Sequence, residues 1–161
     1  MFHMNALENT PPIFNSSEDC VGYAKNVIDQ YLHLKELIKH KNYNKWGNKL
    51  KKCEDINHYL YSKKLNLLNI TATLGLYGNC KCTEDVIVIE QYENILKKLN
   101  CYLGCFPKLL SDKSFNGKIT DIEGMIFLST LSELTLAYHF HQKGYSIESV
   151  SYTHLTLPTT L

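Results

Sequence analysis

The chain has 161 residues, of which 44% are hydrophobic and 20% charged, and its 17 basic side chains face 16 acidic ones. This composition is too apolar and too balanced for a disordered chain, and the length suits one domain with a usable core. A net charge of +1 excludes a protein that is basic overall, so any contact with nucleic acid has to be local. The sequence contains no run of about 18 apolar residues, which predicts a protein that does not cross a membrane.

The first 16 residues are expected to form an irregular lead-in, because Pro11 and Pro12 disfavour a helix there. They lack the positively charged start and the apolar run of a signal peptide. The six cysteines are therefore expected to be reduced thiols in a cytoplasmic protein.

Residues 17–38 are predicted to form one long amphipathic helix. Ser16 or Ser17 can cap its start, and apolar residues follow at spacings of four and three. This stripe consists of Cys20, Ala24, Val27, Tyr31, Leu34 and Ile38. The polar residues 39–49 are expected to be a break between helices, with Gly47 as the turn residue.

A second helix is predicted to begin near Lys49 and to stop where Gly75 and Gly78 are expected to break it. Its apolar side consists of Leu50, Cys53, Ile56, Leu60 and Leu67. A third helix is predicted over 83–99, although the β-branched residues within 83–90 leave a strand as the alternative.

After these helices, residues 101–110 are expected to hold a short helical piece interrupted by Gly104 and Pro107, and residues 111–118 a loop. Thr120 and Glu123 have the spacing of a capping box, which predicts a helix over 121–142.

Gly144 is expected to stop the helix predicted over 121–142, and residues 145–149 alternate like the opening of a strand. The helix is apolar around almost its whole circumference and is therefore expected to be buried between other elements.

Glu133 stands near the middle of this helix, one turn after Ser129 and one turn before Ala137. A buried carboxylate needs a partner or a cation, and the small residues nearby would let a backbone or a metal ion approach. The alternatives are that Glu133 lies at the edge of the apolar face and is solvated, or that it pairs with a local Lys or Tyr.

Residues 131–149, "LSELTLAYHFHQKGYSIES", resemble the opening of the restriction-endonuclease-like, or PD-(D/E)XK, nuclease core. In that core a helix leads through a glycine into the first strand. The resemblance implies that Glu133 supports a divalent metal site, with Mg²⁺ as a cofactor of a full-length parent. The catalytic Asp and the (D/E)-x-K element expected on later strands have no counterpart here. The fragment is therefore expected to be inactive and without a cofactor, because one carboxylate cannot hold a hydrolytic ion.

Residues 150–160, "VSYTHLTLPTT", resemble the in-frame translation of an end adapter from transposase-based sequencing libraries. The resemblance implies that residues 150–161 are an artefactual tail and that the natural gene product continues past residue 149. The alternative is a genuine Thr-rich strand or tail.

Residues 39–52 concentrate positive charge around two aromatic residues, Tyr43 and Trp46. The candidate nucleic-acid-binding residues are Lys39, Lys41, Lys45, Trp46, Lys49, Lys51 and Lys52. Lysines can contact phosphates and aromatic rings can stack on bases, and without arginine such binding would tolerate many sequences. The alternative is a solvated connection between helices whose Trp46 packs on the core.

Two closely spaced cysteine pairs, Cys80 with Cys82 and Cys101 with Cys105, could supply four ligands for zinc. The first pair is spaced too tightly for the usual motif, and no histidine completes the set. Free thiols are expected and no metal site is predicted.

Taken together, the sequence predicts a mainly α chain: a helical bundle-like region over 17–112, then the first helix and strand of a truncated α/β domain over 113–149. Two functions are expected. One is an inactive fragment of a metal-dependent nuclease. The other is a non-catalytic helical module that binds proteins, or nucleic acid without strict sequence preference.

Overall fold

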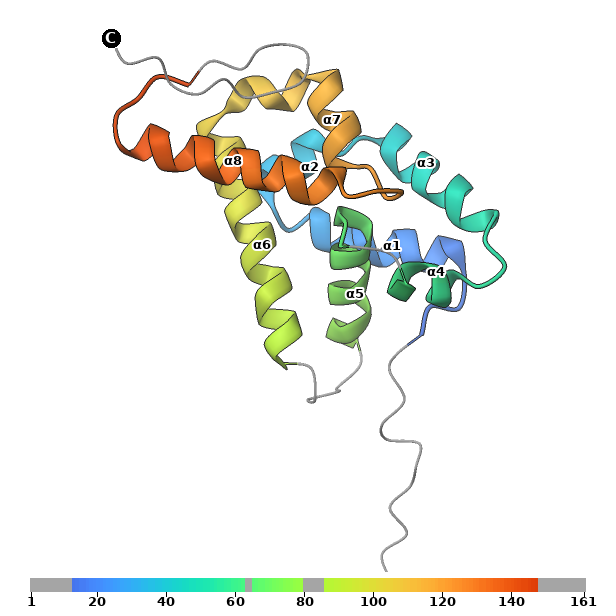
Figure 1. Ribbon diagram of the computed structural model, residues 1–161. Helices are drawn as coiled ribbons and strands as arrows, with labels where there is room; N and C mark the ends of the chain where they lie inside the picture. The colour runs from blue at the N-terminus through green and yellow to red at the C-terminus, as the bar shows by residue number, and fades with distance from the viewer. Residues whose placement is uncertain (1–12, 63–64, 80–85, 148–161) are drawn as a thin grey trace, which may run out of the picture.

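The computed structural model describes residues 13–62, 65–79 and 86–147, and these residues are almost entirely helical (Figure 1). Within those ranges eight α-helices and one 3₁₀ helix follow one another, and no strand occurs. The prediction of a mainly α chain is confirmed. The elements are α1 (Ser17–Ile28), α2 (Leu32–Leu37), α3 (His40–Lys51), α4 (Ile56–Ser62), α5 (Leu67–Asn79), α6 (Val86–Cys105), η1 (Pro107–Ser111), α7 (Lys113–Ile119) and α8 (Ile126–Gln142).

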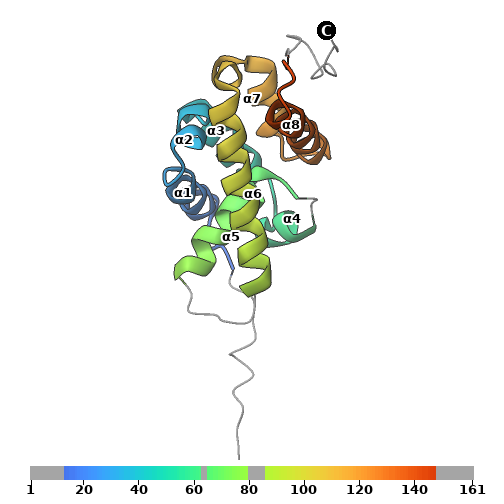
Figure 2. The same cartoon turned by 90° about the vertical axis from the view of Figure 1, so that its left-hand side faces the viewer.

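The longest of these helices, α6, lies beside α5, and α8 packs against it nearer its carboxyl end (Figure 1). Figure 2 shows α1 and α2 on one side of α6 and α8 on the other. Among the described elements, α1 and α5 share the most extensive contact. None of the described helices has the length and apolar character needed to cross a membrane.

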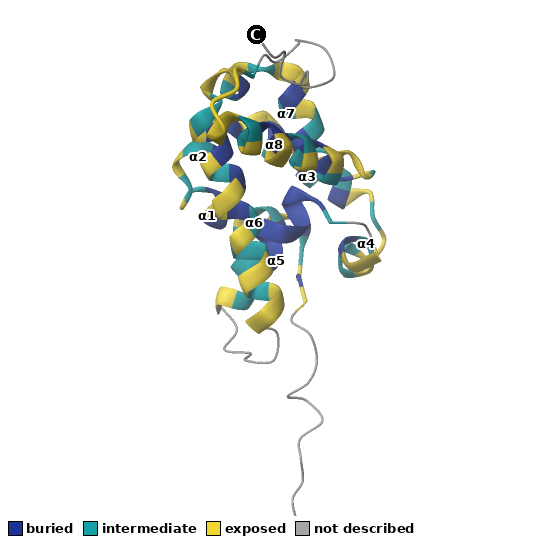
Figure 3. Ribbon diagram, turned by 60° about the vertical axis from the view of Figure 1, so that its left-hand side comes forward, coloured by how far each residue is buried: buried dark blue, intermediate teal, exposed yellow. Residues whose placement is uncertain are grey.

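The core is centred on the first two turns of α5, where residues 67–73 are all buried (Figure 3). Some of its buried residues are polar, and polar groups removed from water need hydrogen-bond partners. The Asn69 side chain donates from Nδ2 to the Leu60 carbonyl at 2.7 Å, and Thr73 Oγ1 donates to Asn69 Oδ1 at 3.1 Å. The first of these bonds joins α5 to α4, and the second holds the Asn69 side chain in place within α5.

The predicted start of the first helix is confirmed, but its predicted length is wrong. Ser16 Oγ accepts a hydrogen bond from the Asp19 amide at 3.0 Å, which caps α1. The chain then turns at residues 29–31 and a separate short helix, α2, carries Leu34 and Leu37 into the core. Apolar residues keep their spacing across so short a turn, so periodicity does not reveal the break.

Residues 39–49 form most of α3, so the prediction of a break between helices was wrong. The Lys39 amide donates to Asn42 Oδ1 at 2.9 Å and closes the first turn. Trp46 and Leu50, one turn apart, are buried on the side opposite the lysines. Two large apolar residues at this spacing stabilise a helix through packing even where the sequence is otherwise polar.

The helix predicted from Lys49 onward is wrong as a single element. Leu50 lies in α3, Ile56 and Leu60 lie in α4, Leu67 lies in α5, and Cys53 lies between α3 and α4. Gly75 and Gly78 lie inside α5 and do not break it. Gly75 faces α1 so closely that a Cβ atom there would lie 2.7 Å from the Tyr23 carbonyl oxygen. The glycine is explained by this close approach of two helices.

From Val86 onward the third predicted segment is the helix α6, so the strand alternative is excluded there; residues 80–85 lie outside the described residues. The interruption expected at Gly104 is also wrong, because α6 runs through it to Cys105. Pro107 then begins η1, a position at which its missing N–H is harmless.

The predicted loop over 111–118 is mostly the helix α7. Asp112 Oδ1 accepts from the Phe115 amide at 3.1 Å and caps it, and Phe115 is buried. Asn116 Nδ2 donates to the Leu37 carbonyl at 3.0 Å and its Oδ1 accepts from Asn42 Nδ2 at 2.7 Å. Contacts with distant helices therefore make this polar segment helical.

The capping box predicted at Thr120 and Glu123 is wrong, because α8 begins only at Ile126. The Thr120 hydroxyl instead donates back to the Asn116 carbonyl at 2.7 Å and belongs to the end of α7. The predicted stop is confirmed: α8 ends at Gln142, and Gly144 has a φ of 86°.

Only one stripe of α8 is buried, so the expectation of burial all round was wrong. The stripe consists of Phe127, Thr130, Leu134 and Ala137. Met125, Ile126 and Leu136 are 53%, 46% and 48% exposed. Residues 145–147 do not form the predicted strand, and residues 148–161, including the adapter-like tail, lie outside the described residues.

Candidate nucleic-acid interface and the predicted carboxylate site

The exposed side of α3 carries a row of lysines. Lys41, Lys45 and Asn48 of α3 recur with Lys52, the residue directly after it, at spacings of four and three residues, which places them on one face. All are exposed, and no acidic residue occurs between Lys39 and Cys53. This set of Lys41, Lys45 and Lys52 is called the lysine face below. It is a local concentration of positive charge in a nearly neutral chain.

Trp46 holds α3 against the rest of the protein and cannot serve as a base-stacking platform. It is 1% exposed, its Nε1 donates to the Thr120 carbonyl at 2.9 Å, and Tyr43 packs edge-on against it at 5.7 Å. The alternative from the sequence is confirmed for Trp46, which packs on the core, but not for the expected connection between helices, because the segment is the helix α3. The candidate role of Trp46 in stacking on a base is corrected accordingly.

Two of the predicted lysines, both in the last turn of α3, form ion pairs with acidic residues of other segments. Lys49 Nζ lies 3.4 Å from Glu123 Oε1, and Lys51 Nζ lies 3.1 Å from Glu18 Oε1. Lys49 is partly buried and the other three side chains are exposed, so water screens both pairs and they contribute little to stability. Within the part of the chain that the structure describes, Lys39 and the lysine face form no ion pair. These lysines are therefore spread from the residue before α3 to the residue after its last turn.

Glu133 lies half-buried at the edge of the buried stripe of α8, next to Leu134 and one turn before Ala137. The serines nearby bond to their own helix: Ser129 Oγ donates to the Ile126 carbonyl at 3.0 Å, and Ser132 Oγ to the Leu128 carbonyl at 2.9 Å. No three His, Cys, Asp or Glu side chains of the described residues come together as a metal-binding group. The supporting role of Glu133 in catalysis stays a prediction.

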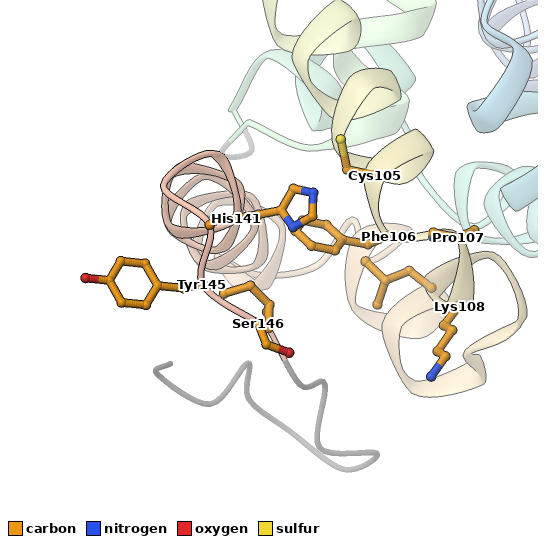
Figure 4. Close-up of a pocket in the computed structure, with 10 residues that line it drawn as sticks. Cys105, Phe106, Pro107, Lys108, His141, Tyr145 and Ser146 are labelled. Atoms are coloured by element: carbon orange, nitrogen blue, oxygen red, sulfur yellow. The ribbon is translucent and has the colours of Figure 1, made fainter. Parts of the chain in front are cut away.

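A cleft that the sequence did not reveal lies between the end of α6, η1 and the end of α8 (Figure 4). Its volume is about 820 Å³, and its walls include Phe106, Lys108, His141 and Tyr145. The rings of Phe106 and His141 meet edge-on at 5.5 Å. Its walls come from two segments about 35 residues apart, so no local pattern in the sequence could indicate it.

The cysteines predicted as free thiols are free where the structure describes them: Cys20, Cys53, Cys101 and Cys105 form no disulfide. Cys80 and Cys82 lie outside the described residues. Comparison of the chain with protein-family models, with curated proteins and with solved structures gives no match of any kind.

Proposed function

We propose that this protein is a non-catalytic helical binding module that contacts the phosphate backbone of nucleic acid through the lysine face of α3. The observation that carries the proposal is the exposed, acid-free row of Lys41, Lys45 and Lys52 on a helix held rigidly by the buried Trp46. A fixed row of ammonium groups matches the regular charge of a phosphate backbone and displaces its counterions.

The charge distribution supports a local interface. Six of the 17 basic residues lie in residues 39–52, which leaves eleven to face the 16 acidic residues elsewhere in the chain. The remainder of the protein is thus acidic and repels a polyanion, which favours contact at α3. Lysine ammonium groups carry no bidentate base recognition, so the binding is expected to tolerate many sequences.

The test is fluorescence anisotropy with a labelled single-stranded DNA over a salt series. Three phosphate contacts predict that the association constant falls about 20-fold between about 50 and 200 mM salt, from a slope of roughly 0.7 per contact. Replacing Lys41 and Lys45 by Gln leaves one contact and predicts a fall of only about 3-fold.

The matched control is the pair Lys97→Gln and Lys98→Gln, two exposed lysines on α6 that remove the same charge. This control is expected to keep the steep salt dependence of the parent. Equal effects of the two double variants would show that only net charge matters and would overturn the proposal. Competition by polyglutamate at equal charge would likewise identify general polyanion binding in place of phosphate recognition.

A second candidate function is favoured by the end of α8. We propose that α8 is the opening helix of a nuclease core of the restriction-endonuclease-like type, with Glu133 supporting a metal site completed by later residues. The support is the succession of a helix, Gly144 with its positive φ, and a non-helical chain at residues 145–147. Sequencing the locus from an independent preparation is the test. An Asp followed by a spaced (D/E)-x-K is expected, and further helical sequence without them would rule the proposal out.

A further inference from the structure

We propose that Cys101 and Cys105 together bind one soft monovalent metal ion, with Cu⁺ as the biological candidate. The two residues lie four apart in the last turns of α6, so their side chains share one helix face. Cys101 is exposed and Cys105 half-buried, and both are free thiols. Residues four apart on a helix have Cβ atoms about 5–6 Å apart, so the two sulfur atoms can reach one shared ion.

Tyr138 of α8 completes the surroundings of the pair. Its hydroxyl lies 3.8 Å from Cys101 Sγ, and its ring packs on Tyr102 at 4.9 Å between centroids. When Cys101 loses its proton, this hydroxyl can donate a hydrogen bond to the thiolate. Tyr138 is thus a positioning residue for the metal ligand.

The number and kind of ligands decide which ion fits. The described residues offer two sulfur atoms here and no group of three His, Cys, Asp or Glu side chains. Structural Zn²⁺ takes four ligands, and Ca²⁺ and Mg²⁺ take oxygen, so these ions do not match a bare thiol pair. Cu⁺ favours thiolate and is stable with two of them. On binding, the ion displaces both thiol protons to solvent, two Cu–S bonds form, and copper remains Cu(I).

The position of the pair allows a metal ion to reach it. Cys101 faces solvent, and Cys105 also lines the cleft between α6 and α8. Figure 4 shows the Cys105 sulfur directed away from His141, which lies across the cleft against Phe106. His141 is therefore not a third ligand in this arrangement, and the coordination stays at two sulfur atoms.

The proposal is tested by titrating the full chain anaerobically with Cu(I) against a coloured Cu(I) chelator. One tightly held Cu(I) per chain is expected. Cys101→Ser and Cys105→Ser should each weaken its affinity by about 100-fold, because the second thiol acts at high effective concentration. The double variant keeps neither thiol and should bind Cu(I) more weakly than either single variant. Cys53→Ser removes a half-buried thiol at the end of α3 and is expected to bind like the parent.

The other pair of possible Cu(I) ligands in the chain consists of the two closely spaced cysteines Cys80 and Cys82. A Cys80→Ser, Cys82→Ser variant is expected to retain the bound Cu(I); if that variant loses it while Cys101→Ser keeps it, the proposal is overturned. Tyr138→Phe should keep one Cu(I) per chain and lower its affinity about 10-fold, as loss of a ligand-orienting hydrogen bond does. Far-UV circular dichroism of each variant shows whether it is folded, and an unchanged affinity in folded Cys101→Ser refutes the site.

Discussion

Gly75 and Gly78 lie one turn apart on α5 and offer a matched pair of substitutions. Alanine is favoured over glycine inside a helix by about 1 kcal/mol at either position. At Gly78 no atom lies within 4 Å of the added Cβ, so Gly78→Ala is expected to stabilise the fold. At Gly75 the Cβ would meet the Tyr23 carbonyl oxygen at 2.7 Å, the Tyr23 Cβ at 2.8 Å and the carbonyl carbon at 2.9 Å.

These neighbours belong mainly to the backbone of α1 and cannot rotate away, so Gly75→Ala has to push α1 and α5 apart. Overpacking of this kind costs about 1–3 kcal/mol. The helix-propensity gain at Gly78, next to the end of α5, is at most that at Gly75, so the difference between the free energies of unfolding of the two variants is a lower bound on the packing cost. That difference is expected to be about 1–3 kcal/mol, with Gly75→Ala less stable than Gly78→Ala.

Urea unfolding followed by circular dichroism at the helix band measures both free energies. With an m-value of about 2 kcal/mol/M, the midpoints of the two variants should differ by roughly 0.5–1.5 M. Equal midpoints, or a higher midpoint for Gly75→Ala, would show that α1 and α5 do not approach at Gly75. The close helix contact at the centre of the fold would then be refuted.

Three further substitutions test single interactions by the same unfolding measurement. Trp46→Phe keeps the apolar ring but leaves the buried Thr120 carbonyl without its donor, which is expected to cost about 1–3 kcal/mol. Ser16→Ala removes the cap of α1 and is expected to cost about 0.5–2 kcal/mol. Burial raises the pKa of the Cys20 thiol to about 12, so the folded chain holds a proton that the unfolded chain releases above about pH 9. The stabilisation is complete below pH 9 and is lost as pH rises toward 12, and Cys20→Ala is expected to flatten this decline by up to about 1.4 kcal/mol per pH unit.

Each of these expectations has an outcome that contradicts it. If the Trp46→Phe chain is as stable as the parent, the hydrogen bond from Trp46 to the Thr120 carbonyl does not stabilise the fold. The control for Ser16→Ala is Ser62→Ala, which removes an exposed hydroxyl that donates to the Tyr59 carbonyl. If both variants lose the same free energy of unfolding, the Ser16 cap does not stabilise α1 more than an ordinary surface hydrogen bond would. An unchanged decline of stability between pH 9 and pH 11 in Cys20→Ala would show that this thiol is not buried in the folded chain.

The candidate nucleic-acid-binding residues of 39–52 were predicted in part from the sequence. The lysines of 39–52 were found as a cluster because they are neighbours in sequence. Their division into a free face and two ion-paired members depends on Glu18 and Glu123, which lie far away along the chain. The burial of Trp46 could not be foreseen either, because its partner Thr120 is 74 residues distant.

The sequence by itself determined the helical class, a helix that starts next to Ser16 or Ser17, and the stop at Gly144. Each of these depends on residues within about one or two turns of one another, through spacing, side-chain capping or glycine's access to positive φ. Only the tertiary structure decided that α3 and α7 are helices, that α5 passes through Gly75, and that Tyr138 meets Cys101. Those features arise from packing and hydrogen bonds between distant segments, and no local pattern carries that information.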